Sequence, residues 1–150
     1  VRVYNVHFQS IRFDHDDYKL IDEIIKESEL EDIKRSRMLL ERMHDAWVKR
    51  AVQSRMVNDH IKQCPYPVIV CGDFNDGPVS YAYQQFAPHL KDVFVERGTG
   101  IGNTYVGKVP LLRIDNILHT KELEAFSHEV HPFELSDHHA VSSILGLKSE

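Results

Sequence analysis

The sequence is poor in cysteine, has fewer basic than acidic residues, and contains no long apolar run. Two cysteines, Cys64 and Cys71, are too few for a disulfide framework, and Cys71 is expected to be a small core residue. No stretch approaches the roughly 18 apolar residues that cross a bilayer, so the sequence predicts no membrane-spanning segment. The net charge of -5 argues against tight non-specific binding of duplex nucleic acid but leaves nuclease activity open.

The composition that is present is ordinary for one layered domain. Hydrophobic residues make up 42% and charged residues 27% of 150 residues, which allows a single core. Strand patterns at residues 1–8, 67–71, 111–118 and 140–145 surround a long helical segment and a short helix. This order predicts an α/β fold.

The segment between the first two strands is predicted to be helical. Asp16 and Asp17 begin one helix, and Ser28 with Glu31 caps or restarts a second. Apolar residues then recur at spacings near three and four, at Ile33, Leu40, Met43, Trp47, Ala51 and Val57. Two interpretations of residues 27–48 stay open: a solvated helix with its apolar side on the sheet, or a surface that faces a partner or a membrane.

Polar side chains stand at the ends of the predicted strands. Asp73 and Asn75 follow the apolar run 67–71, and residues two apart in extended chain point the same way, roughly 6.6 Å apart. Asp115 lies within the apolar strand 111–118, and His138 precedes the strand 140–145. Because ligands gather where strand ends meet loops, these residues are expected to form one site.

These residue types suit attack of water on a phosphate ester. Carboxylates hold a hard divalent cation, Mg²⁺ by default, which neutralises phosphate charge. His138 can exchange a proton near neutral pH, with Asp115 behind it to fix the tautomer, while Asn75 can donate to a phosphate oxygen. Two duller interpretations stay open: Asp73 as a turn cap, and Asp115 in a structural ion pair with Arg113.

The same residues resemble the endonuclease/exonuclease/phosphatase superfamily. The resemblance is carried, in order, by Asn5-Val6-His7-Phe8, Gly72-Asp73-Phe74-Asn75, Thr104-Tyr105, Arg113-Ile114-Asp115-Asn116-Ile117 and Ser136-Asp137-His138. Each string alone is weak, but five in the right order across nearly the whole chain are strong together.

The resemblance implies a role for each matching residue. His138 and Asp115 would form the general acid/base dyad, and Asp73 would orient or activate the water and also bind metal. Metal ligation also falls to Asp137, and His7 would contact phosphate or donate a proton. Asn75 would contact the phosphate, with Asn5 and Tyr105 as further substrate-binding residues and Thr104 beside Tyr105 lining the cleft.

The resemblance also implies a fold, which is half of a four-layer α/β/β/α sandwich of the deoxyribonuclease-like type. The family's upstream strands, which end in Asn and in a metal-binding Glu, have no counterpart here. Residues 1–150 are therefore expected to be the C-terminal half of one domain, with the N-terminal half absent. The absent half is one expected partner, and a second copy that covers an exposed sheet face is another.

The function expected from the resemblance is Mg²⁺-dependent hydrolysis of phosphate esters by the intact protein, with Mn²⁺ as the alternative metal. The substrate would be a nucleic acid, an inositol phosphate or a phospholipid head group. The fragment alone is expected to be weakly active or inactive, because one metal ligand is lacking. The alternative is a catalytically silent phosphate-binding or interaction module on the same scaffold.

Overall fold

The computed structural model describes residues 1–11, 13, 15–19, 21, 33–107, 109, 111–133 and 135–148. Residues 15–19 are helical, in agreement with the helix start predicted at Asp16 and Asp17. The predicted helix restart at Ser28 and Glu31 lies outside the described residues.

Four strands form the main sheet in the order β1-β2-β4-β3. These strands are β1 (Arg2–His7), β2 (Val68–Asp73), β3 (Lys91–Asp92) and β4 (Asp115–His119). β1 pairs with β2 in parallel, whereas β4 is antiparallel to both of its neighbours. A separate antiparallel pair consists of β5 (Leu123–His131) and β6 (Ala140–Leu147).

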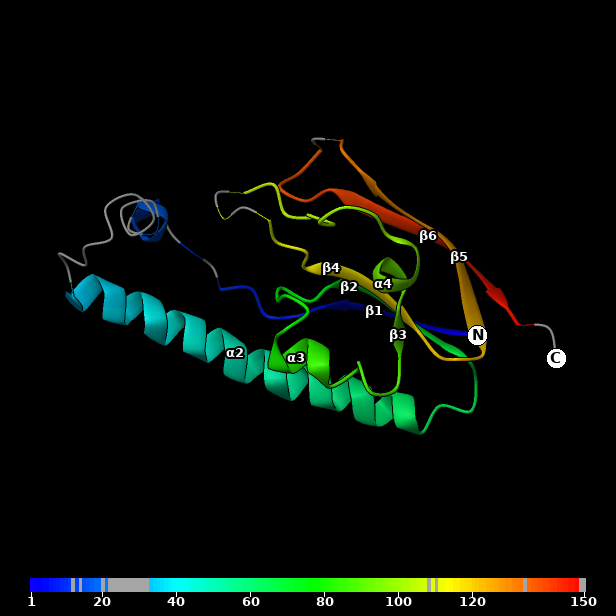
Figure 1. Cartoon of the computed structure of the whole chain (residues 1–150). Coiled ribbons are helices and arrows are strands. Elements are labelled where there is room, and N and C mark those ends of the chain that lie inside the picture. The colour runs from blue at the N-terminus through cyan, green and yellow to red at the C-terminus, as the bar shows by residue number, and fades with distance from the viewer. Residues whose placement is uncertain are drawn as a thin grey trace.

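The long helix and the second sheet lie on opposite sides of the main sheet. The long helix α2 (Ile33–Lys62) runs below the sheet in Figure 1, together with the short helix α3 (Tyr81–Gln84), while β5 and β6 lie above it. Helix α4 (Val93–Arg97) follows β3 directly and contacts both β4 and β5. The α/β class predicted from the sequence is confirmed by these layers.

The hydrophobic core fills the space between α2, α3 and the main sheet. Its aromatic centre is Phe8, Phe74 and Phe86, with ring centroids of Phe8 and Phe74 5.2 Å apart. Val68 and Val70 of β2 and Leu118 of β4 point toward it. Alternate residues of β2 therefore carry the burial, as the two-residue period of a strand requires.

The face of α2 that packs on the sheet is more polar than the sequence pattern predicts. Arg50, Ser54 and Asn58 are buried at four-residue intervals, while Leu40 and Trp47 are largely exposed. The predicted apolar face is wrong for those two residues. Arg50 can be buried because its guanidinium finds hydrogen-bond partners there: it donates to the Asp76 carboxylate and to the Gln9 carbonyl.

Among the described residues, no helix is long and apolar enough to cross a membrane.

Two strand predictions need correction. The sequence does not predict β5, because its residues, Leu-Glu-Ala-Phe-Ser-His-Glu-Val-His, do not alternate regularly between polar and apolar. The pairing of β5 with β6 also shifts register between Ala125 and Ser127. Asp115 begins β4 instead of lying within a strand from residue 111. Asp115 therefore lies at the end of its strand, beside Asp73 at the end of β2.

The face of β1 turned away from α2 is open along its length. Val3, Asn5 and His7 alternate on this face and are exposed, and Val3 retains 60% of its accessible surface. Ile69 and Cys71 of β2 are half-buried on the same side. An apolar residue is thus exposed beside the polar strand end.

Gly72 is required by the close approach of β1 and β2. Its φ is +133°, and a Cβ at this position would lie 2.0 Å from the backbone oxygen of Val6. Both the backbone conformation and the neighbouring strand therefore exclude a side chain. The glycine before Asp73 has a structural reason that is independent of chemistry.

Gly72→Ala is expected to destabilise the protein by at least about 2 kcal/mol, because the new methyl group would push β1 away from β2. Urea unfolding followed by circular dichroism measures the change. Gly77→Ala is the matched control, since a Cβ there meets nothing within 4 Å. Equal stability of the two variants would contradict the argument.

Candidate active site

The site is centred on a carboxylate at the start of a strand of the main sheet and an imidazole from the segment that leads into the second sheet. Nδ1 of His138 lies 2.8 Å from Oδ2 of Asp115, and both side chains are largely buried. Asp115 begins β4, and His138 lies two residues before β6. The pair leaves Nε2 of His138 for proton exchange with another group.

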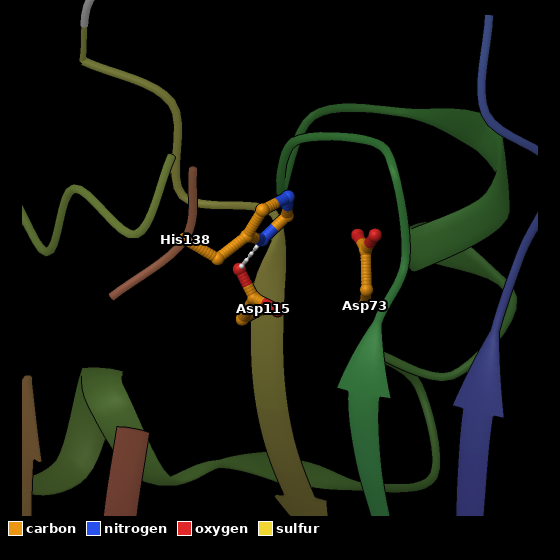
Figure 2. A group of neighbouring side chains, drawn as sticks. All are labelled: Asp73, Asp115 and His138. Atoms are coloured by element: carbon orange, nitrogen blue, oxygen red, sulfur yellow. Dashed lines mark hydrogen bonds and ion pairs between the residues drawn. The ribbon is translucent and has the colours of Figure 1, made fainter. Parts of the chain in front are cut away.

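Strand register places two further predicted residues beside Asp115. Asp73 pairs with Asp115 across β2 and β4, and His7 pairs with Asp73 across β1 and β2. Nε2 of His7 lies 3.5 Å from Oδ2 of Asp73. Figure 2 shows Asp73 on the neighbouring strand, level with the imidazole of His138. Three strand ends thus bring their polar side chains into one row.

Asn75 holds the Asp73 carboxylate in place. The Asn75 backbone N–H donates to Oδ1 of Asp73 and its side-chain amide donates to Oδ2, each at 2.6 Å. The same amide donates to the Phe8 carbonyl at 3.0 Å. Asn75 has a φ of 51°, a left-handed conformation that asparagine tolerates. Asp73 therefore does cap its own turn, and in the same position it faces the cleft.

Phe74 explains why Asp73 points outward. Its ring is completely buried and packs against Phe8 and Phe86. Because alternate residues in extended chain point in opposite directions, burial of Phe74 turns Asp73 toward the cleft. The left-handed turn at Asn75 then brings its amide onto the Asp73 carboxylate.

Two pKa values in the site are shifted by this arrangement. Burial raises the pKa of Asp73, and the negative charge of Asp115 raises it further, against the opposing effect of the Asn75 backbone hydrogen bond. Burial alone would lower the pKa of His138, but the hydrogen bond and charge of Asp115 outweigh it and raise that pKa. The site therefore favours a positive imidazolium between negative groups.

Thr104 supports Asp115 from below. Its hydroxyl oxygen accepts from the backbone N–H groups of Ile114 and Asp115 at 3.0 and 3.1 Å, and the residue is fully buried. Its carbonyl accepts from the His139 N–H at 2.7 Å. Thr104 thus links Asp115 to His139, the residue that follows His138, and does not line the cleft, contrary to the prediction.

A cleft of about 590 Å³ opens over these strand ends. Its lining includes seven of the predicted site residues, namely His7, Asp73, Asn75, Tyr105, Asp115, Asp137 and His138. The eighth, Asn5, does not line this cleft, because it lies one strand repeat further from the edge, opposite Cys71. Asp137 is exposed at the rim, where its carbonyl accepts from the Val106 N–H.

Apart from Ser10, the rest of the lining is aromatic or aliphatic, and the sequence does not predict it. It includes Ile11, Phe13, Tyr18, Val109, Leu112 and Ile114. Phe13 and Tyr18 follow β1 in a polar stretch, where single aromatic residues give no periodic signal. Tyr105 is half-buried among them, and burial together with the Tyr18 hydroxyl raises its pKa to about 12. Tyr105 is therefore a neutral phenol at physiological pH.

The Arg113 side chain points away from this cleft. Its guanidinium donates to the Asp92 carboxylate at 2.8 Å and to the Asn116 side-chain oxygen at 2.9 Å. The alternative ion pair between Arg113 and Asp115 is therefore wrong, since each has another partner. Arg113 instead anchors the chain immediately before β4.

The donor atoms of the site fit a hard divalent cation. Atoms of Asp73, Asp115 and His138 lie within 4.8 Å of one another. Burial raises the pKa of Asp73 most, and the charge of the nearby Asp115 carboxylate raises it further, so a cation would relieve the repulsion between the two carboxylates. Mg²⁺ prefers oxygen, and the His138 Nδ1 is already occupied by Asp115. The carboxylate oxygens are therefore the fitting ligands.

Residues 4–138 match the model of the Endonuclease/Exonuclease/phosphatase family. The chain is similar to an endonuclease/exonuclease/phosphatase from Bacteroides vulgatus, with 27% identity and a TM-score of 0.57 over 67% of this chain and 44% of that one. Comparison with curated proteins gives no match.

Two further solved structures share the fold at lower identity. The Bacteroides thetaiotaomicron mannosyl-6-phosphatase is 22% identical, with a TM-score of 0.52 over 69% of this chain and 46% of that chain. The human Nocturnin catalytic domain with bound sulfate is 21% identical, with a TM-score of 0.53 over 72% and 42%. The predicted deoxyribonuclease-like fold is confirmed, and the chain spans less than half the length of these structures.

Proposed function

This chain belongs to the endonuclease/exonuclease/phosphatase family, and from that premise we propose that the intact protein is a Mg²⁺-dependent phosphoric ester hydrolase. The observation that carries the proposal is the 2.8 Å contact between His138 and Asp115 at one end of a cleft that also contains Asp73. An imidazole held by one carboxylate and facing another is suited to moving a proton during attack of water on phosphorus.

Each residue of the row has a proposed part in that reaction. Nε2 of His138 exchanges a proton with a reacting oxygen, while Asp115 fixes the ring and stabilises its positive form. Asp73 orients the attacking water, and Asn75 holds Asp73. For Asn75 to contact the phosphate as well, its amide has to exchange its bond to Asp73 or to the Phe8 carbonyl for one to a phosphate oxygen. The exposed imidazole of His7 contacts a phosphate oxygen from the neighbouring strand.

The proposed metal ligands are Asp73 and Asp137, with Asp115 close enough to contribute through its charge. Mg²⁺ held by these residues, or Mn²⁺ in its place, would neutralise phosphate charge and stabilise the departing oxygen. This placement is supported by the position of both carboxylates in the same cleft. The oxygens of a bound phosphate would supply further ligands for the cation.

We further propose that residues 1–150 form the C-terminal half of one domain. The support is that the chain spans 44% of the Bacteroides vulgatus structure. A family site divided in this way lacks ligands that the other half supplies, so the chain alone is expected to be much less active than the longer gene product. Equal specific activity of the two would refute the division.

Removal of divalent metal is expected to abolish hydrolysis by the intact protein, and addition of Mg²⁺ or Mn²⁺ to restore it. Release of nitrophenol from bis(p-nitrophenyl) phosphate after EDTA treatment and dialysis is the measurement. Asp73→Asn should raise the Mg²⁺ concentration for half-maximal activity by more than about tenfold. Asp59→Asn, an exposed α2 residue, is the control. Full activity in excess EDTA would contradict the metal assignment.

A second candidate function is a phosphate-binding module without turnover. The feature that favours it is that the ligand group of Asp73, Asp115 and His138 contains no glutamate. Turnover on a panel of abasic duplex, single strands, inositol phosphates, sphingomyelin and a generic diester separates the two candidates. Binding without turnover of any member, with Mg²⁺ present, would replace the enzyme by the module.

A further inference from the structure

One wall of the cleft is built of aromatic rings that lead away from the catalytic pair. The rings of Phe13 and Tyr18 meet edge to face with centroids 5.5 Å apart. The Tyr18 hydroxyl lies 3.3 Å from the Tyr105 hydroxyl, and the Tyr105 ring lies 5.4 Å from that of His138. These three residues, Phe13, Tyr18 and Tyr105, are called the aromatic wall below.

The aromatic wall is fixed to the scaffold from two sides. On one side, Asp17 pairs with Arg42 of α2, and the Asp17 side chain is only 12% exposed. On the other side, Tyr105 bridges to His138 and its N–H donates to the Leu112 carbonyl at 3.1 Å. A surface held in this way loses little conformational freedom when it binds a ligand.

The chemistry of the two sides of the cleft differs sharply. The strand ends supply carboxylates, an amide and imidazoles, whereas the wall adds aromatic rings next to Ile11 and Val109. A phosphoryl group at the strand ends therefore places the substituent on its ester oxygen against the wall. The three residues of the aromatic wall carry no positive charge to pair with a further phosphate, whereas a flat ring can stack on them.

We propose that the aromatic wall selects phosphate esters that carry a flat aromatic ring, such as a nucleobase or an aryl group, near the phosphate. This inference rests on the proposed function for the place of the phosphate. It names a substrate class within that function, and ligand binding tests it without requiring turnover.

The experiment measures the affinity of the intact protein for four ligands by calorimetry at constant Mg²⁺: inorganic phosphate, cyclohexyl phosphate, phenyl phosphate and thymidine 5′-phosphate. Phenyl phosphate is expected to bind at least about fivefold more tightly than inorganic phosphate, since stacking of one ring on aromatic side chains gives roughly 5- to 150-fold. It should also bind more tightly than cyclohexyl phosphate. If thymidine 5′-phosphate binds at least as tightly as phenyl phosphate, the ring that the wall selects is a nucleobase. If it binds more weakly than phenyl phosphate, the ring is that of an aryl ester.

Variants of the wall make the inference specific. Tyr18→Ala should remove most of the preference for phenyl phosphate, whereas Tyr18→Leu should keep apolar volume and lose the preference over cyclohexyl phosphate. Tyr66→Ala is the matched control, because Tyr66 is a half-exposed tyrosine that does not line the cleft. Thermal unfolding of each variant checks that it is folded, and Phe13→Leu provides a second variant that retains bulk.

Three results overturn the inference: cyclohexyl phosphate bound as tightly as phenyl phosphate, an unchanged preference in folded Tyr18→Ala, or no binding of any ester. The first would indicate an apolar tail, as in a lipid. Selective binding with no turnover of any substrate would refute the proposed hydrolase and leave the selectivity standing, so the two failures are distinguishable.

Discussion

His138→Ala is expected to lower kcat of the intact protein by about 10²- to 10⁴-fold, the range that a positioned acid/base group contributes. The imidazole has its Nδ1 bound to Asp115, and the rest of the cleft is built by other strands. Loss of the ring should therefore remove proton transfer while leaving substrate binding largely intact. The expected signature is a fall in kcat with little change in KM.

Steady-state kinetics on a substrate of verified turnover provide the measurement. His44→Ala is the matched control, because His44 is a 71% exposed histidine on α2 outside the cleft. Asp115→Asn should also lower kcat, and the double variant with His138→Ala should be no worse than His138→Ala alone, since the pair acts as a unit. Wild-type turnover by His138→Ala would reject the assignment of the dyad.

The largest effect on stability is expected from Asp92→Ala, which should destabilise the protein by about 3–5 kcal/mol. Asp92 and Arg113 are 6% and 8% exposed at their side chains, and their contact is 2.8 Å. The Asp92 carboxylate also accepts from the Tyr83 hydroxyl and from the Phe94 backbone N–H. Its removal leaves a buried guanidinium whose charge has lost its counter-ion.

Chemical unfolding of the variant tests this, with Asp59→Ala as the control. Asp59 pairs with Lys62 at 3.5 Å on the surface of α2, and loss of such an exposed pair should change stability by less than about 1 kcal/mol. Asp92→Ala combined with Arg113→Met should recover part of the loss, because the uncompensated charge is then gone. A loss below 1 kcal/mol for Asp92→Ala alone would contradict the burial argument.

The row of polar strand ends was predictable because each member follows a local rule. The apolar run before Asp73 marks a buried strand, so Asp73 is expected at its end. Asn75 reaches the same cleft through a left-handed turn, which the extended-chain spacing does not predict. His138 lies just before a strand, as the sequence predicts. What the sequence does not contain is that this strand belongs to a second sheet with β5, since pairing between distant segments leaves no periodic trace.

The anchors of the site were equally hidden. Arg113 meets Asp92 across 21 residues of chain, and neither has a neighbouring pattern that points to the other. Thr104 was expected in the cleft, but its hydroxyl is used below Asp115. Tyr18 approaches Tyr105 over 87 residues. Each of these contacts depends on tertiary packing, which overrides local propensity.

Asp115 and His138 come from segments that lead into different sheets, so the geometry of their contact depends on how the two sheets are positioned relative to each other. Asp115 is the first residue of β4, and His138 lies in the segment that leads into β6. These two segments are connected by the hydrogen bonds of Thr104 to Asp115 and His139 and by the bridge between Tyr105 and His138. A small shift of one sheet relative to the other would lengthen the 2.8 Å contact between His138 and Asp115, while the hydrogen bonds within each sheet stayed intact. The contact that the proposed chemistry needs is therefore more sensitive to a shift between the two sheets than the strands themselves are.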